Sequence, residues 1–267
     1  MYNYEKEYYD YEGLWDPQLR SEIERERVKE VLRVIPTDVT SILDVGCGDG
    51  IFCNEAKKKG QFKQLVGMDR SRAALYHVQT GKVLGSIDKL PFHSSEFDLL
   101  TVLEVLEHLP LNIYENALLE LCRVARKYIL LTVPNNECLR MSAVQCPVCF
   151  TVFSRYFHLR TFNYRNLQEL FCNYGFNLNM FKQIGITEVY IFKKQIKLIK
   201  QIIFGHDKKL GNSICPVCGF RTRKSERKPN MRDNYDNRLQ KYIKYILSKY
   251  MPVQRKFKWI LALYQKN

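Results

Sequence analysis

The stretch Ser41-Ile-Leu-Asp-Val-Gly-Cys-Gly-Asp-Gly50 decides the fold of this 267-residue chain. Residues 42–45 are a short apolar run that enters a glycine-rich turn directly, and residues 51–60 then follow with helical spacing. Glycine lets a backbone approach a ligand closely, and the first amides of a helix are free to bind it. In an open α/β sheet, a turn at the carboxyl end of the first strand is the expected ligand site. Glycines in a tight turn can also serve packing alone.

Strand and helix patterns alternate on both sides of this turn. Alternation of this kind predicts a parallel sheet with helices on both faces. The pattern predicts strands over residues 42–45, 64–68, 82–87, 97–103, 128–133, 187–192 and 258–264. It predicts helices over residues 17–35, 51–60, 72–80, 112–125, 193–204 and 236–250, and another near 163–174.

Acidic side chains follow three of these expected strands. Asp69 ends the second strand, where a carboxylate can accept both hydroxyl protons of a ribose. Asp88 follows the third strand, where it can meet the exocyclic amine of an adenine, and Glu104 ends the fourth strand at the mouth of the sheet. Asp69 could instead cap a helix and Asp88 could start an ordinary turn. The combination favours one ligand that spans several strand ends.

Five segments together resemble the class I S-adenosylmethionine-dependent methyltransferases. They are ILDVGCGDG, GMDRS, IDKLPF, FDLLTVLEVLEHL and YILLTVPN, which occur in the order and spacing of that family. The resemblance covers residues 38–135 well and the terminal KWILALYQK loosely, and it points to the branch of quinone-biosynthesis O-methyltransferases and many glycan-cluster enzymes. It implies a doubly wound, seven-stranded Rossmann-like α/β sheet with an antiparallel last strand.

The resemblance also implies S-adenosylmethionine as the methyl donor. The protein then mainly orients the acceptor and excludes water, and it supplies a base if the acceptor is a hydroxyl or thiol. The cofactor-binding residues carried over by position are Asp44, Gly46, Cys47, Gly48 and Gly50 in the first turn, Asp69 at the ribose, Arg70, Asp88, Lys89 and Leu90 around the adenine, and Glu104 facing the methyl group.

Four titratable side chains are candidates for the catalytic site: Glu104, Glu107 and His108 in LEVLEHL, and His158 in FHLRTF. The E-x-x-E-H run with a later histidine resembles the magnesium-type site of small-RNA 3′-terminal 2′-O-methyltransferases. Two carboxylates and two imidazoles can hold a second divalent metal that polarises a hydroxyl. Without metal, either histidine can act as the general base. A third interpretation has Glu104 and His108 only lining the pocket, with His158 capping or joining the neighbouring cysteine pair.

Two CPVC pairs, Cys146/Cys149 and Cys215/Cys218, stand out among nine cysteines. Each pair places two thiolates about one turn apart, and together they provide the four thiolates of a structural zinc site. The alternative is a pair of turns without metal. We expect a zinc-knuckle insertion in which the metal joins the basic C-terminal insertion to the catalytic core.

The positive charge is concentrated near the C-terminus. Residues 193–267 hold 20 Lys+Arg and 4 Asp+Glu, whereas residues 1–192 hold 22 and 24. Such a block suggests an anionic partner, and the segment 193–258 is the candidate surface for RNA or an anionic membrane. A solvated basic face is the plain alternative.

These observations predict four segments: 1–36 as an N-terminal cap and helix, 37–192 as the S-adenosylmethionine-binding core with the first CPVC pair, 193–257 as a basic insertion with the second, and 258–267 as the terminal strand. No apolar run reaches the roughly 18 residues of a membrane-spanning helix, and the acidic, aromatic start lacks a secretory pattern. We therefore expect a cytoplasmic protein, or one on the membrane surface.

The expected function is O-methylation of a small molecule or glycan acceptor. One alternative is an RNA methyltransferase of the 2′-O type that uses the basic C-terminal region. The other is a non-catalytic binding protein with a vestigial cofactor site.

Overall fold

The computed structural model describes residues 20–191 and 252–267 continuously, together with residues 8–11, 14–15 and 213–221 and positions 195, 198, 201, 202, 206 and 210. The chain divides into two compact units. The sheet unit comprises residues 5–137, 158–185 and 257–267, and the insertion unit comprises residues 1–4, 138–157 and 186–256.

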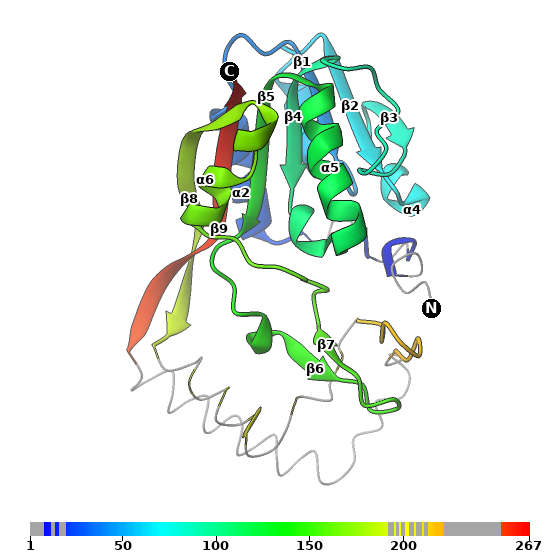
Figure 1. Ribbon diagram of the computed structural model, residues 1–267, viewed down its shortest axis with the longest axis vertical. Helices are drawn as coiled ribbons and strands as arrows, with labels where there is room; N and C mark the ends of the chain where they lie inside the picture. The colour runs from blue at the N-terminus through cyan, green and yellow to red at the C-terminus, as the bar shows by residue number, and fades with distance from the viewer. Residues whose placement is uncertain are drawn as a thin grey trace. The chain divides into compact units, whose positions relative to one another are not determined.

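A seven-stranded sheet forms the centre of the sheet unit, with strand order β3-β2-β1-β4-β5-β9-β8 (Figure 1). β1 pairs in parallel with β2 and β4, β2 with β3, and β4 with β5. β9 runs antiparallel to β5, so the expected seven-stranded sheet with an antiparallel last strand is confirmed. The strand bounds are β1 Ser41–Val45, β2 Gln64–Asp69, β3 Gly81–Leu84, β4 Phe97–Leu103, β5 Ala125–Pro134, β8 Phe176–Tyr190 and β9 Val253–Lys266.

Helices cover both faces of this sheet (Figure 1). α5 (Leu111–Val124) packs into one apolar core, whereas α2 (Glu22–Arg33) and α3 (Ile51–Lys58) pack into another. Because successive side chains of a strand point to opposite faces, Leu43 joins the first core and Ile42 the second. Burial on both faces fixes β1, and with it the turn that follows.

Among the elements of the sheet and its helices, α4 and β8 differ most from the sequence-based prediction. α4 spans only Arg72–Leu75, because the side-chain amide of Asn54 bonds the carbonyl of His77 and the N–H of Gln79 and holds them outside a helix. β8 begins at Phe176 rather than near residue 187. Its first half alternates apolar residues with asparagines, a period-two pattern that is half-polar and therefore easily taken for a loop.

The region after β5 also contains short helices. The helix predicted near 163–174 is divided into α6 (Tyr164–Glu169) and a 3-10 turn, η5 (Cys172–Tyr174). Of the predicted helices 193–204 and 236–250, only positions 195, 198, 201 and 202 are described, and these are helical; the rest lie outside the described residues. Within the part of the chain that the structure describes, no helix is long and apolar enough to cross a membrane.

Candidate functional site

The glycine turn after β1 has the backbone shape that only glycine adopts easily. Gly46, Gly48 and Gly50 have φ angles of +73°, +55° and +75°. A Cβ atom on Gly46 would lie 2.5 Å from a methyl group of Val105. Because α3 starts immediately after Gly50, its first amides belong to the same turn, and the Ile51 N–H already donates to Oδ1 of Asp49 at 3.3 Å. The turn is therefore shaped to receive a ligand at close range.

Asp69 is fixed against this turn from the end of β2. The Gly48 N–H donates to its Oδ2 at 2.9 Å, and the Ser71 N–H donates to its Oδ1 at 2.8 Å. Burial raises the pKa of Asp69, although these amide bonds oppose the shift. Each carboxylate oxygen retains a further lone pair, so Asp69 can also accept ribose hydroxyls. This arrangement fits the expected nucleoside.

Asp44, just before the turn, and Cys47, within it, are both buried. Asp44 is 2% exposed, and it accepts a 2.6 Å hydrogen bond from the Thr101 hydroxyl. Burial raises the pKa of Asp44 to about 7. The thiol of Cys47 is also buried, which raises its pKa strongly.

The adenine side of the site has fewer available groups than the sequence suggests. The N–H of Leu90 donates to Glu120 at 2.7 Å and its carbonyl accepts from Arg123 at 3.0 Å, so its backbone is already paired. Asp88 is half-buried and accepts a hydrogen bond from the Ser86 hydroxyl. Lys89 and Arg70 are exposed.

Two aromatic residues from the N-terminal segment lie over the cofactor turn, and sequence patterns did not reveal them. A Cβ atom on Gly48 would lie 2.7 Å from the ring of Trp15. The Tyr9 carbonyl accepts hydrogen bonds from the Trp15 indole at 2.6 Å and from the Ser71 hydroxyl at 2.7 Å. The Tyr9 ring also lies edge-on to His108, with centroids 6.3 Å apart.

Glu104 follows β4 with a φ angle of +60°, which is unusual for a residue with a side chain. Its Oε2 accepts a 2.6 Å hydrogen bond from the Trp259 indole, and its Oε1 lies 3.6 Å from Nη1 of Arg27. Burial raises the pKa of Glu104, while Arg27 and then Trp259 act in the opposite direction. Arg27 and Trp259 are site residues that the sequence did not indicate.

The structure brings together three of the four predicted catalytic residues. Metal-ligating atoms of Glu107, His108 and His158 all lie within 4.8 Å of one another. Glu107 is 0% exposed, and neither of its carboxylate oxygens has a hydrogen-bond partner among the described residues. Burial, followed by the charge of Glu104, raises its pKa well above the ordinary value. A buried carboxylate without hydrogen-bond donors is a suitable ligand for a cation or a proton.

The four CPVC cysteines converge within the insertion unit. Sγ of Cys146 lies 3.6 Å from that of Cys218, and Sγ of Cys149 lies 3.4 Å from that of Cys215. All four thiols lie within 4.8 Å of one another. We predicted the first pair in the core segment, but residues 138–157 belong to the same unit as the second pair. The converging thiols form a suitable four-ligand set for a metal ion.

The two CPVC turns share one backbone pattern. In the first, which lies between β6 (Ala143–Gln145) and β7 (Val152–Ser154), the Cys146 N–H donates to Thr151 and its carbonyl accepts from Phe150. In the second, Cys215 makes the same two bonds to Phe220 and Gly219. The Thr151 hydroxyl lowers the pKa of Cys149 to about 6, which favours the thiolate that binds metals.

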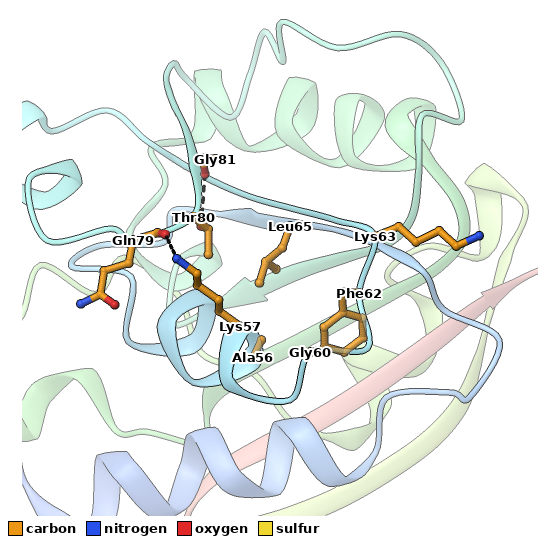
Figure 2. Close-up of a pocket in the computed structure, with 9 residues that line it drawn as sticks. All are labelled: Ala56, Lys57, Gly60, Phe62, Lys63, Leu65, Gln79, Thr80 and Gly81. Atoms are coloured by element: carbon orange, nitrogen blue, oxygen red, sulfur yellow. Dashed lines mark hydrogen bonds between the residues drawn. The ribbon is translucent and has the colours of Figure 1, made fainter.

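A surface pocket of about 360 Å³ lies away from these groups (Figure 2). It is lined by the end of α3, the loop before β2 and the start of β3, including Lys57 and Lys63. Leu65, near the start of β2, borders it, whereas Asp69 ends the same strand. The pocket therefore lies at the opposite end of β2 from the cofactor turn, and the Lys57 ammonium already donates to the Gln79 carbonyl at 2.7 Å.

Comparison with known proteins identifies the family. A family model described as a methyltransferase domain matches residues 18–179. A ubiquinone biosynthesis O-methyltransferase of Thiobacillus denitrificans is 32% identical over 110 residues, which are 36% of this chain and 47% of that protein. The chain thus matches about half the length of this curated relative.

Solved structures show the same fold at low identity. An S-adenosylmethionine-dependent methyltransferase of Archaeoglobus fulgidus has a TM-score of 0.54 at 13% identity, covering 96% of this chain and 100% of that one. Magnesium protoporphyrin IX methyltransferase of Synechocystis, solved with bound S-adenosylhomocysteine, has a TM-score of 0.52 at 13% identity, covering 67% and 91%. The chain belongs to the methyltransferase-domain family, and its fold is that of the S-adenosylmethionine-dependent methyltransferases.

Proposed function

We propose that this methyltransferase O-methylates a small molecule or glycan. The observation that carries the proposal is the cluster of Glu107, His108 and His158, with ligating atoms within 4.8 Å of one another. It follows β4, at the sheet edge where β1 and β2 also end, so an acceptor hydroxyl held there lies near the cofactor turn. The curated relative that matches over 110 residues is itself an O-methyltransferase.

The residues of the turn have separate roles in this proposal. The bound cofactor supplies a methyl group on a sulfonium, which needs no further activation. The backbone from Gly46 to Gly50 receives the methionine part, Asp69 accepts the ribose hydroxyls, and Asp88 meets the adenine. Leu90 and Lys89 border the adenine. The Leu90 backbone makes no bond to it, because its N–H and carbonyl are already paired with Glu120 and Arg123.

In this proposal, either His108 or His158 takes the proton of the acceptor hydroxyl. A hydroxyl is a poor nucleophile until a base removes its proton, and an imidazole is suited to that step near neutral pH. The unpaired carboxylate of Glu107 beside two imidazoles also fits a divalent ion, which would lower the pKa of the hydroxyl. Glu104, held by Trp259 and Arg27, shapes the same mouth of the sheet.

The Cys146, Cys149, Cys215 and Cys218 cluster is proposed as a structural zinc site. Four thiolates complete a tetrahedral shell, which leaves no open position for catalysis. The site would join the two stretches of the insertion unit.

The proposed acceptor can be tested with isotopically labelled S-adenosylmethionine and a panel of quinol, phenol and glycan acceptors. His108→Ala and His158→Ala should lose most methyl transfer, whereas His93→Ala, an exposed histidine outside the cluster, should retain it. Loss of activity with a chelator that magnesium restores but zinc does not selects the metal mechanism, and chelator resistance with inactive histidine variants selects the base. Full activity in both cluster variants would remove these histidines from the mechanism.

The basic segment 193–258 is proposed to meet an anionic membrane surface, which would suit a lipid-linked acceptor and a peripheral location in the cytoplasm. Most of this segment lies outside the described residues. The matches reported above do not favour an RNA acceptor or a non-catalytic role. Vesicle binding that requires anionic lipid would support the membrane proposal, whereas RNA binding with a steep salt dependence would contradict it.

A further inference from the structure

Glu137 and His158 mark the points where the chain leaves and re-enters the sheet unit. The Asn136 N–H donates to the Phe162 carbonyl at 2.9 Å, and Asn135 forms a parallel bridge with Phe162. The Asn135 N–H donates to the Lys258 carbonyl at 2.9 Å. The stretches 135–137 and 158–162 therefore lie side by side at the end of β5, and their backbones are fixed.

The returning stretch is also tied to the turn η3 (Leu106–His108). The Leu159 N–H donates to the Glu107 carbonyl at 2.7 Å. The Arg160 guanidinium donates to the Leu106 carbonyl at 3.2 Å and to the Leu109 carbonyl at 2.6 Å. These bonds hold the backbone next to His158 against the backbone of Glu107.

His158 consequently contacts both the carboxylate of Glu137 and the ring of His108. Its Nδ1 is hydrogen-bonded to Oε2 of Glu137, and its ring lies 4.7 Å from that of His108, centroid to centroid. The side chains of Glu137 and His158 are 22% and 14% exposed, so both are largely shielded from solvent. A carboxylate can accept a hydrogen bond but cannot donate one, so Nδ1 of His158 carries the hydrogen.

We propose that Glu137 is a positioning residue that fixes the Nδ1–H tautomer of His158 and so places the lone pair of that ring on Nε2. The hydrogen bond at one ring nitrogen sets which form the other nitrogen takes, both for a general base and for a metal ligand. The inference rests on the proposed function only for what Nε2 then does; the tautomer itself follows from the contact.

A purely structural role for the pair is the competing explanation. Glu137 and His158 stand at the base of the excursion 138–157, so their bond could simply close that loop. Such a structural contact would affect stability but would not require one particular ring nitrogen to carry the proton. The tautomer therefore separates the two roles.

The test is nitrogen NMR of protein with ¹⁵N-labelled imidazole rings, at a pH where His158 is neutral. The chain has 5 histidines, and His158→Gln identifies the signals of interest. Wild-type His158 should show a protonated Nδ1 and an unprotonated Nε2. Glu137→Ala should shift the population toward Nε2–H, Glu137→Gln should restore part of the Nδ1–H form through its side-chain carbonyl, and the exposed control Glu115→Ala should change nothing.

A wild-type Nε2–H tautomer, or an unchanged tautomer in both Glu137 variants, would overturn the proposal. A lower melting temperature with an unchanged tautomer would show that the pair has only a structural role. Because the measurement needs neither cofactor nor acceptor, its outcome is independent of the methylation assay. A correct tautomer without methyl transfer would leave Glu137 in its role and refute the proposed function instead.

Discussion

The indole nitrogen of Trp259, on the last strand, donates a 2.6 Å hydrogen bond to Oε2 of Glu104, 155 positions earlier in the chain. Trp259 lies opposite Pro134 in the antiparallel pairing of β5 and β9, at the edge of the sheet where β4 also ends. Arg27 of α2 approaches the other carboxylate oxygen and lies 5.1 Å from the centre of the Trp259 ring. The C-terminal strand is therefore part of the site as well as of the sheet.

Trp259→Phe keeps an aromatic ring but removes the bond to Glu104. Hydrogen bonds to charged groups contribute about 1.5–3 kcal/mol, so we expect the free energy of unfolding in urea to fall by about that amount. Trp15→Phe is the matched control, because its indole donates to a neutral carbonyl, for which we expect about 1 kcal/mol. Equal losses in the two variants would contradict the special role of the Glu104 bond.

Glu107→Gln should change the pH dependence of stability. Burial raises the pKa of Glu107, so the native state keeps this proton to a higher pH than the unfolded chain. Its contribution to stability is full below the unfolded pKa and is lost as pH rises toward the native pKa, by about 1.4 kcal/mol per pH unit within that window. In the presence of a chelator, the free energy of unfolding of Glu107→Gln should therefore increase relative to that of the wild type as pH rises.

The difference between the two unfolding free energies reports Glu107 together with its charge interaction with Glu104, because the buried acids elsewhere contribute equally to both proteins. Glu115→Gln, at an exposed position of α5, should run parallel to the wild type at every pH. A wild type and Glu107→Gln variant with parallel curves would show that Glu107 does not titrate differently on folding.

Zinc should be present at about one ion per chain in protein purified without added metal, as four thiolates require. Cys215→Ser should lower the melting temperature strongly and change cofactor affinity little, since the cysteine cluster and the cofactor turn belong to different units. Cys172→Ser, an exposed cysteine outside the cluster, is the control. A metal-free wild type with undiminished stability would rule out the structural zinc.

The sequence predicts β1, β2, β4 and β5 and the glycine turn well because their signals are local, whereas it misses the first half of β8. The apolar run, the positive-φ glycines and the acid at the end of β2 all lie within short windows of the chain. The convergence of Glu107, His108 and His158 was also predictable, since both segments follow neighbouring strands.

The supporting residues were not predictable, because their roles depend on distant partners. Arg27 stands on the helix face that buries Val28 and Val31, a position usually occupied by apolar residues, and only the fold places it beside Glu104. Trp259 resembles a core residue until its indole nitrogen meets a carboxylate. The Glu137 side chain bonds the ring of His158, and the Arg160 side chain bonds the carbonyls of Leu106 and Leu109; such contacts leave no periodic pattern.

The most direct test of the account is calorimetric titration of S-adenosylmethionine or S-adenosylhomocysteine into wild-type protein, Asp69→Ala and the exposed control Asp38→Ala. We expect one binding site for the cofactor, with a dissociation constant on the order of micromolar or weaker, as metabolite sites commonly show. Asp69→Ala should bind at least about tenfold more weakly, about 1.4 kcal/mol, because the ribose acceptor is lost, and Asp38→Ala should match the wild type. No heat with the intact protein, or full affinity in Asp69→Ala, would contradict the cofactor site on which the whole account depends.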